Sequence, residues 1–472
     1  MADHRLGLRS CEDEHHDVGL DVEGELPHWL DGTLFGNGPG LFEVGDRPLR
    51  HWFDGFAMLR RFRIRDGAVR YSNRFLRSEA YRSAREGSLA FGEFGTTPRF
   101  PRIAALKLLA GGPLTDNASI TVRHRDGSYL AVTETKRAVA FDPETLATLG
   151  TREIDAGIEA TGTLAHDHYD PRRAETIGLG TRLGSDPGYV LTRRPDGGRA
   201  EEFARIDVEE PAYMHSFALT DDHVVLTESP LRIAPNEMLS GTSFAETFRW
   251  HPDGRTRFLI VDRDSGTLVA EAETDPFFTF HHANAFEEDG EIVLDCAAFP
   301  DGLVVGALSL ARLRRGRPDL PGAELRRYRI DVATERVGKE TLHPGPFEFP
   351  TFDYPHRNGR TYRYLYGVGR GRGAAFDDRV LGVDLETREA RHWSDERCYP
   401  GEPLYIPGPG DAENDGVLLS VVLDAREERS FLLVLDAATI EERARAWLPH
   451  ALPFGFHGSF FQTGETRVPS MA

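Results

Sequence analysis

Four short stretches of this 472-residue sequence place histidine in an apolar, aromatic setting. They are TLAHDHYDP around His166, AYMHSFALT around His215, FTFHHANAF around His281 and His282, and PFGFHGSFF around His457. Burying an imidazole costs free energy unless its ring nitrogens find partners. A single such histidine is more often a satisfied core residue, but several in matching settings favour one shared site. Because imidazole binds Zn, Cu, Fe and Ni well, the sequence indicates a transition-metal site.

The adjacent pair His281 and His282 raises a question of register. Neighbouring side chains on a β-strand point to opposite faces of the sheet. If FFTFHHANAF forms a strand, only one of the two imidazoles faces the metal, and the strand pattern does not decide which.

Three glutamates also stand in apolar surroundings: Glu134 in AVTETKRAV, Glu348 in PFEFPTFDY and Glu402 in YPGEPLYI. A histidine that ligates a metal usually donates its other ring N–H to a carboxylate or a carbonyl. We therefore predict that these glutamates orient the ligating histidines; local salt bridges with nearby arginines are the alternative. Motifs for rival chemistries are missing, since the sequence has no GxSxG, no Walker A loop and no GxGxxG after a strand.

Histidines this far apart in the sequence meet only if the fold brings separate strands together. Short apolar runs such as HVVLTES, EIVLDCAAF and SFLLVLD alternate with turn clusters such as RDGS and EEDGE, a β pattern. The segments DPETLATLG, DRDSGTLVAE, DVATERVGKE, DLETREARH and DAATIEERARAW resemble one repeated unit. This all-β pattern predicts a β-propeller, whose blades converge on an axis; two β-sandwiches are the alternative. No glycine-rich linker divides the chain, so we expect residues 1–472 to form a single domain.

Composition and charge argue against several partners. The formal net charge of −20 disfavours nucleic acid, because phosphate binding needs surplus Lys and Arg. The basic residues are nearly all arginine, which indicates a halophilic archaeon or, alternatively, a GC-rich genome. Cysteines without a CxxC motif predict neither a disulfide framework nor a thiolate zinc site. The polar N-terminus and the lack of an apolar run of about 20 residues predict a cytoplasmic protein, and no protein partner is inferred.

One segment departs from the β pattern. Residues 99–112, RFPRIAALKLLAGG, predict a short amphipathic helix with a basic flank. Its apolar members are Ile103, Leu106, Leu108 and Leu109. Such a helix suits a peripheral membrane anchor or the mouth of a substrate tunnel, and a helix that packs on the propeller is the alternative.

A longer series of motifs resembles the carotenoid cleavage oxygenases, in the branch of the animal carotene oxygenases and the retinal pigment epithelium retinoid isomerase. From about residue 26 to residue 461, these motifs are GTLFGNGPGLFEVG, HWFDGFAMLRRF, TETK, AHDHYDP, YMHSF, FHHANAFE, FEFPTFDY, YPGEPLY and GFHGSFF. The resemblance implies a seven-bladed β-propeller with a helical and loop cap over an axial metal site. It also implies that a segment at about 91–118 belongs to the cap and faces the membrane.

Motif by motif, the resemblance implies a non-haem Fe2+ cofactor whose ligands are His166, His215, His281 and His457. In the third motif the ligand precedes Asn284 by three residues, which selects His281. His282 then points the opposite way, as a structural or solvent-side residue. The glutamates implied to bond these ligands are Glu134, Glu348 and Glu402, and Thr133 is implied to lie near an open position of the iron.

The reaction that the resemblance implies is cleavage of a conjugated C=C bond of a carotenoid or apocarotenoid with O2, giving aldehyde or ketone products. The substrate would be a lipophilic polyene that enters from a membrane surface. Relatives that cleave stilbenes place a lysine directly before the first glutamate, where this chain has Thr133, so a stilbene-cleaving dioxygenase is a disfavoured alternative. A retinoid isomerohydrolase on the same scaffold and a non-catalytic carotenoid-binding propeller are further alternatives.

Overall fold

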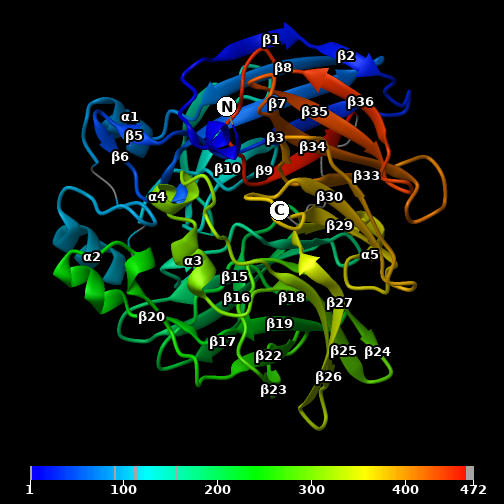
Figure 1. The fold of residues 1–472 in the computed structure, drawn as a ribbon. Coiled ribbons are helices and arrows are strands. Elements are labelled where there is room, and N and C mark those ends of the chain that lie inside the picture. The colour runs from blue at the N-terminus through cyan, green and yellow to red at the C-terminus, as the bar shows by residue number, and fades with distance from the viewer. Residues whose placement is uncertain (1–2, 90–91, 111, 113, 156, 464–472) are drawn as a thin grey trace.

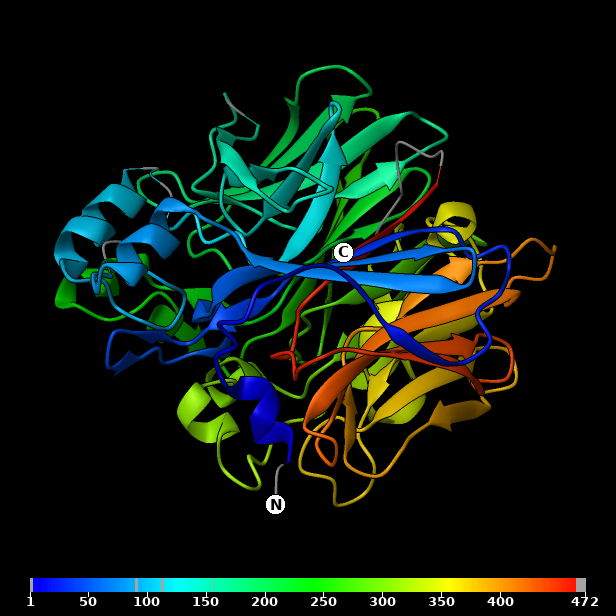
Figure 2. The same cartoon turned by 90° about the horizontal axis from the view of Figure 1, so that it is seen from above.

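The computed structural model describes residues 3–89, 92–110, 112, 114–155 and 157–463. In these residues, seven antiparallel sheets of four or more strands surround one axis as the blades of a ring (Figure 1, Figure 2). The predicted seven-bladed β-propeller is confirmed, and the alternative of two β-sandwiches is wrong.

The first four blades follow one another along the chain, and the strand nearest the axis is named first. Blade 1 consists of β9 (Thr121–Arg125), β10 (Ser128–Val132), β11 (Arg137–Phe141) and β12 (Thr148–Glu153). Blade 2 consists of β13 (Gly162–Thr163) and β14 (His168–Asp170), then β15 (Glu175–Arg182), β16 (Gly188–Pro195) and β17 (Glu201–Asp207). Blade 3 consists of β18 (Ala218–Leu219), β19 (His223–Glu228), β22 (Thr256–Asp262) and β23 (Leu268–Thr274). Blade 4 consists of β24 (His282–Glu288), β25 (Glu291–Ala298), β26 (Glu324–Asp331) and β27 (Arg336–Pro346).

The other three blades complete the ring. Blade 5 consists of β28 (Glu348–Thr351), β29 (Tyr364–Gly369), β30 (Arg379–Asp384) and β31 (Ala390–Trp393). Blade 6 consists of β32 (Cys398–Pro400) and β33 (Leu404–Pro407), then β34 (Gly416–Asp424), β35 (Arg429–Asp436), β36 (Glu442–Trp447) and β2 (Asp21–Gly24). Blade 7 consists of β37 (Gly458–Gln462), β3 (Gly32–Gly36), β7 (Phe56–Arg65), β8 (Ala68–Phe75) and β1 (His15–Gly19), with β4 (Pro39–Leu41) beside β7.

Strands from both ends of the described chain close the ring. β37 forms the inner edge of blade 7 by pairing with β3, in a register that sets Gly458 opposite Gly36. The N-terminal strands form the rims of two neighbouring blades, since β1 pairs with β8 and β2 pairs with β36. Backbone hydrogen bonds between N-terminal and C-terminal strands therefore complete blades 6 and 7 and close the ring.

The repeated unit predicted from the sequence is the turn between the third and fourth strands of a blade. In blade 1, Asp142 accepts hydrogen bonds from the N–H of Thr145 (2.7 Å) and from its hydroxyl (2.8 Å), and Leu146 then adopts a φ of 55°. The same aspartate contact recurs in four more blades, at Asp262, Asp331, Asp384 and Asp436. A carboxylate that bonds the backbone two or three residues on stabilises such a turn, which explains the recurring Asp-x-x-Thr pattern.

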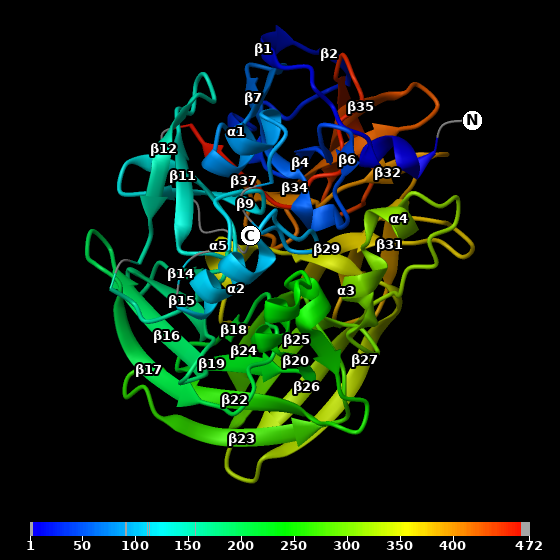
Figure 3. The ribbon, with the colours of Figure 1, turned by 90° about the vertical axis from the view of Figure 1, so that its left-hand side faces the viewer.

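Short helices and hairpins gather over one end of the axis, as Figure 3 shows for α1 to α4. These helices are η1 (His4–Leu8), η2 (Trp52–Asp54), α1 (Glu79–Arg85), α2 (Pro101–Leu109), η3 (Pro235–Ser240), η4 (Ala245–Thr247), α3 (Leu303–Ala307) and α4 (Leu310–Leu313). The short helix α5 (Tyr354–Arg357) lies on the opposite side of the molecule from α2 (Figure 1). The remaining strands form two hairpins, β5 (Glu43–Val44) with β6 (Arg47–Pro48) and β20 (Leu231–Ile233) with β21 (Phe248–Trp250). Within the described residues, none of these helices is long and apolar enough to span a membrane. Of the expected cap segment 91–118, residues 91, 111 and 113 lie outside the described residues.

Candidate metal centre

Four blades each bring one histidine to the axis. His166 lies between β13 and β14 of blade 2, whereas the other three directly precede or nearly precede the inner strands of their blades: His215 before β18, His281 before β24 and His457 before β37. Because inner strands converge at the centre of a propeller, the imidazoles meet there. One nitrogen from each ring lies within 4.8 Å of the others, and all four residues are buried.

The other three blades each place a glutamate behind one of these histidines. Glu134 follows β10 in blade 1, Glu348 begins β28 in blade 5, and Glu402 lies between β32 and β33 in blade 6. Each accepts a hydrogen bond from the Nδ1–H of one ring: Glu134 from His215 (2.5 Å), Glu348 from His281 (2.5 Å) and Glu402 from His457 (2.7 Å). The alternative of salt bridges with arginines is wrong, because the ion-pair partners of these glutamates among the described residues are the histidines.

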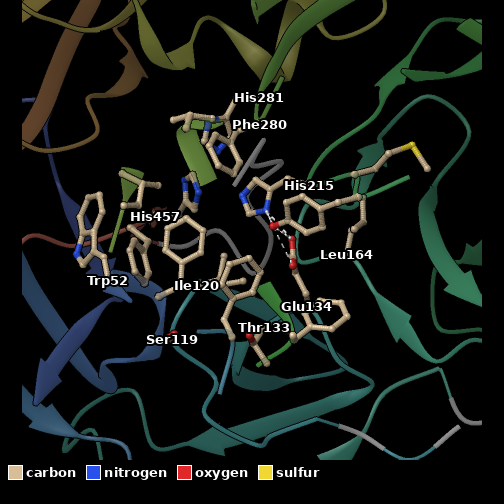
Figure 4. Close-up of a pocket in the computed structure, with 18 of the residues that line it drawn as sticks. Trp52, Ser119, Ile120, Thr133, Glu134, Leu164, His215, Phe280, His281 and His457 are labelled. Atoms are coloured by element: carbon tan, nitrogen blue, oxygen red, sulfur yellow. Dashed lines mark hydrogen bonds and ion pairs between the residues drawn. The ribbon is translucent and has the colours of Figure 1, made fainter. Parts of the chain in front are cut away.

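These contacts decide which ring nitrogen faces the axis. When a carboxylate accepts the Nδ1–H, the neutral imidazole presents the lone pair of Nε2 on its other side. Figure 4 shows His215, His281 and His457 around a common space, with Glu134 bonded to His215. Nε2 of His281 is buried there without a hydrogen-bond partner among the described residues, and Nε2 of His166 lies 3.0 Å from Nε2 of His215.

This arrangement fits a transition-metal ion. A buried nitrogen without a partner is costly, and nitrogens that face one another with lone pairs repel, so a cation among them would remove both penalties. Two nitrogens on opposite sides of one ion, each about 2.1 Å from it, lie about 4.2 Å apart, which is close to the spread of the four rings. The donor set contains no thiolate and no carboxylate, which suits Fe, Zn, Cu or Ni better than Mg or Ca.

Burial also controls the protonation of the site. Burial, aided by the charges of His281 and His215, lowers the pKa of His457 well below its usual range, so the ring is neutral. Burial raises the pKa of Glu402 well above its usual range, and the N–H of Gly458 only partly opposes that shift. A dication bound by the neutral rings would stabilise the ionised carboxylates behind them.

His282 is buried as well, but it points away from the four axial histidines. Its Nδ1 lies 2.7 Å from the hydroxyl of Ser216 and its Nε2 lies 2.7 Å from the hydroxyl of Thr227. His168 is likewise hydrogen-bonded through both ring nitrogens. Burial lowers the pKa of His282 to about 3 and that of His168 to about 4, so both rings are neutral structural residues. The solvent-side alternative for His282 is therefore wrong.

An apolar cavity lies beside the histidines. Its volume of about 220 Å³ is far more than the roughly 10–15 Å³ that one water molecule needs. Thr133 and Ile120 line it next to the histidine and glutamate residues (Figure 4). Its aromatic wall includes Trp52, Phe53, Phe94, Phe280, Phe299 and Phe456. A largely apolar molecule is the ligand that such a cavity fits best.

Comparison with known proteins places this architecture in a family. Residues 8–462 match the family model described as retinal pigment epithelial membrane protein. The chain belongs to the carotenoid cleavage oxygenase family. It is 35% identical over 487 residues to carotenoid cleavage dioxygenase 8 homolog B, chloroplastic, of Oryza sativa, covering 96% of this chain and 84% of that protein. It is 32% identical to the carotenoid isomerooxygenase of Galleria mellonella, covering 97% and 96% of the two chains.

Solved structures agree with this assignment to the carotenoid cleavage oxygenases. The cobalt-substituted apocarotenoid oxygenase of Synechocystis superimposes with a TM-score of 0.86 at 30% identity, covering 98% of each chain. The similarity therefore extends over the whole propeller and its cap.

The helix predicted at 99–112 exists in this carotenoid cleavage oxygenase, but it is shorter and spans Pro101–Leu109. Ile103 and Leu106 are 54% and 60% exposed, whereas Leu108 is buried in a cluster with Met238 of η3 and lines the cavity. Leu109 is partly buried and is not part of the described cavity wall. One face of the helix therefore packs on η3 and its surroundings, and the other face is exposed; a role as a membrane anchor stays a prediction.

Sequence reasoning missed functional neighbours of the metal centre. The hydroxyl of Tyr213 donates to Glu134 (3.2 Å), and Tyr213 stands two residues before His215 in the same motif. Because alternate residues of an extended segment share a face, that spacing was a usable signal. Ile120 gave no comparable signal, because an isoleucine in a strand is ordinary until the cavity beside it is known.

Proposed function

We propose that the protein is a non-haem Fe2+-dependent oxygenase that cleaves a conjugated C=C bond of a carotenoid or apocarotenoid with O2. The products are aldehydes or ketones. The observation that carries this proposal is the convergence of four imidazoles, one with a buried and unpartnered Nε2, beside an apolar cavity. The names of the relatives, a carotenoid cleavage dioxygenase and an apocarotenoid oxygenase, support the substrate class.

The proposed iron ligands are His166, His215, His281 and His457, and the proposed orienting residues are Glu134, Glu348 and Glu402. Redox chemistry with O2 favours Fe2+ over Zn2+ among the metals that an all-imidazole set accepts. Bound Fe2+ would supply the activation of O2 that attack on the C=C bond requires. Thr133, in the cavity wall directly before Glu134, is proposed to lie near an open position of the metal.

The chain itself positions the reactants and excludes water. Each glutamate holds one ring in a single tautomer, so the Nε2 lone pairs stay aimed at the axis. The aromatic and aliphatic wall removes the polyene from water and leaves it few ways to lie across the site. Cleavage of R–CH=CH–R′ by O2 places one oxygen atom on each carbon and transfers no proton overall. We therefore assign no catalytic acid or base beyond the iron ligands.

The test is product analysis with iron-loaded protein under air. We expect O2 consumption and two carbonyl products that together account for every carbon of the polyene, and we expect an iron chelator to abolish turnover. Mass spectrometry of the products would instead reveal an isomerohydrolase if a retinoid product appeared without O2 consumption. Cleavage of stilbenes but of no polyene would favour the stilbene-cleaving alternative, and binding without turnover would favour a carotenoid-binding protein.

We also propose that this cytoplasmic enzyme takes its lipophilic substrate from a membrane surface. Phe100, Ile103 and Leu106 are 59%, 54% and 60% exposed on one side of α2, beside the basic Arg102 and Lys107. An exposed apolar face with basic neighbours favours peripheral binding to lipid. In a liposome flotation assay, the wild type should float with the vesicles, and an Ile103→Ser, Leu106→Ser double variant should stay in the dense fraction. Leu149→Ser, at a similarly exposed leucine outside α2, is the matched control and should still float.

Two further features remain proposals. We propose that residues 1–472 fold as one domain, because strands from both ends of the described chain complete the ring; a single cooperative unfolding transition would support this. We propose a halophilic archaeal source from the net charge of −20 and the scarcity of lysine. Activity that rises into molar salt would support that origin, and inactivation by such salt would contradict it.

A further inference from the structure

The wall of the cavity contains one charged pair that the proposed chemistry does not use. Arg370 and Asp377 begin and nearly end the loop between β29 and β30 of blade 5, and both line the cavity. Among the described lining residues, Arg370 alone carries a guanidinium or an ammonium group. Its neighbours in the wall include Leu320, Phe347 and Val368, so the charge borders an otherwise apolar space.

The loop holds Arg370 in a fixed place. The N–H of Gly371 donates to Asp378 (2.7 Å), and the N–H of Asp378 donates to the carbonyl of Gly369 (3.0 Å). Phe376 is buried and stacks on Phe454 with 4.7 Å between ring centroids. These contacts close the loop on itself and anchor it in the core, so the guanidinium is pre-positioned before any ligand arrives.

Most donors of Arg370 remain available. A guanidinium has five N–H donors. Within the described residues, Arg370 makes one hydrogen bond, from Nη2 to the carbonyl of Leu320 (2.8 Å), and it interacts with Asp377 through charge alone. A cation that borders an apolar space with most of its donors unused is unfavourable, so an oxygen atom of a ligand that accepts from those donors would stabilise this arrangement.

The charged pair lies close to the metal centre. Burial raises the pKa of Asp377; the charge of Arg370 opposes that shift and the charge of Glu348 adds to it. Glu348 in turn bonds the Nδ1–H of His281 (2.5 Å). α2, where we place the entrance, lies on the other side of the cap from β29 (Figure 1, Figure 3). A polyene that enters at α2 and passes the histidines therefore ends near Arg370.

We infer that Arg370 determines substrate specificity by donating hydrogen bonds to an oxygen atom at the inner end of the polyene. This inference rests on the proposed function. The ligand class is a polyene that carries a hydroxyl or carbonyl oxygen at that end, since a pure hydrocarbon offers Arg370 no acceptor. Anchoring one end at a fixed place also fixes which double bond lies over the metal, so Arg370 controls the position of cleavage as well as affinity.

The test compares Arg370→Leu with wild type on polyenes that differ only in end-group oxygen: a hydrocarbon carotene, its ring-hydroxylated counterpart and an aldehyde-terminated apocarotenoid. Losing a hydrogen bond to a charged group should raise KM about tenfold or more for the oxygenated substrates, with kcat less affected. The distribution of cleavage positions, measured by mass spectrometry of the products, should broaden. KM for the hydrocarbon should not change. Arg370→Lys, which keeps a charged donor, should recover part of the affinity.

Arg372→Leu is the matched control, because Arg372 belongs to the same loop but is exposed and does not line the described cavity. It should behave as wild type, and iron content and melting temperature should match in all variants. If Arg370→Leu had the KM and the cleavage position of the wild type on oxygenated substrates, the inference would be overturned while the proposed function stood. Wild-type protein that cleaves no polyene would instead overturn the proposed function.

Discussion

Two histidine–glutamate pairs in this molecule are each joined by a hydrogen bond from Nδ1 to a carboxylate oxygen, but they lie in different environments. At the axis, Nδ1 of His281 donates to Glu348 (2.5 Å), and the opposite nitrogen of the ring is buried without a partner among the described residues. Between blades 3 and 4, Nδ1 of His223 donates to Glu287 (3.0 Å), and Glu287 also accepts a hydrogen bond from the hydroxyl of Thr220. The side chains of this peripheral pair are 19% and 31% exposed.

The difference shows that a carboxylate behind an imidazole does not by itself make a metal site. The axial ring faces three further imidazoles within 4.8 Å and borders an apolar cavity. The hydrogen bond with Glu287 raises the pKa of the peripheral ring of His223, and the charges of Asp262 and Asp222 add to that shift. At the axis, Nε2 of His281 needs a cation as its partner. At the periphery, His223 carries a proton and forms an ordinary ion pair with Glu287.

The largest expected effect is the loss of metal on His281→Ala. Removing one of four ligands and opening a gap in the set should lower the iron content to a small fraction of the wild-type value, measured by elemental analysis of anaerobically reconstituted protein. His282→Ala should keep its iron, because the ring of His282 bonds Ser216 and Thr227 rather than facing the axis. It should lose about 3 kcal/mol of stability, because two buried hydroxyls lose their partner.

Denaturant unfolding of each apo and iron-loaded variant separates the two effects. Iron should stabilise the wild type and His282→Ala but not His281→Ala, since only ligands that survive can couple binding to folding. Equal loss of iron from both variants would contradict the assigned register of the two histidines.

A smaller effect is expected when the carboxylate, rather than the ring, is changed. Glu348→Gln should weaken iron binding by about 10- to 100-fold, because an amide accepts the Nδ1–H less strongly and compensates no charge. Glu287→Gln makes the same chemical change in the peripheral pair and should leave iron affinity at the wild-type value. Competition against a chelator gives both affinities, and weakened binding in Glu287→Gln would remove the distinction between the two environments.

Much of the propeller and its centre could be predicted from the sequence. The Asp-x-x-Thr turns mark the outer hairpins, because a carboxylate that bonds the backbone leaves a local signature. The apolar settings of Glu134, Glu348 and Glu402 also marked them, because a carboxylate in such surroundings demands a partner. The choice of His281 over His282 could not come from strand alternation, which separates the two faces without naming the inner one.

Features that depend on contacts between distant segments escaped prediction. The partners of His282 come from blade 3, whereas the histidine belongs to blade 4, so no local pattern reveals them. The position of Arg370 in the cavity wall results from the closure of one loop against the cap, and an arginine in a glycine-rich segment otherwise indicates a solvated turn. The amphipathic helix was correctly located, yet it begins at Pro101 rather than at residue 99, because proline occurs readily at the first position of a helix; it ends at Leu109.

The smallest expected effect is a pH dependence confined to the peripheral pair. The hydrogen bond from His223 to Glu287 raises the pKa of His223. Burial opposes ionisation of Glu287, but its hydrogen bonds with His223 and Thr220 lower its pKa to about 2. The contribution of His223 is complete below its unfolded pKa of about 6.5 and is lost as the pH rises through the folded value. The contribution of Glu287 is complete above about pH 4.3 and is lost as the pH falls through about 2.

The pair should therefore stabilise the fold most between about pH 4.5 and 6.5. Because both side chains reach solvent, the difference in unfolding free energy between wild type and Glu287→Gln should not exceed about 1 kcal/mol at pH 5.5, and it should shrink by pH 8.5. Urea unfolding of the iron-loaded wild type and Glu287→Gln at the two pH values measures this difference in unfolding free energy. If the difference were the same at both, His223 would not change its protonation between these pH values, and the proposed proton-dependent contribution of the peripheral pair would be wrong.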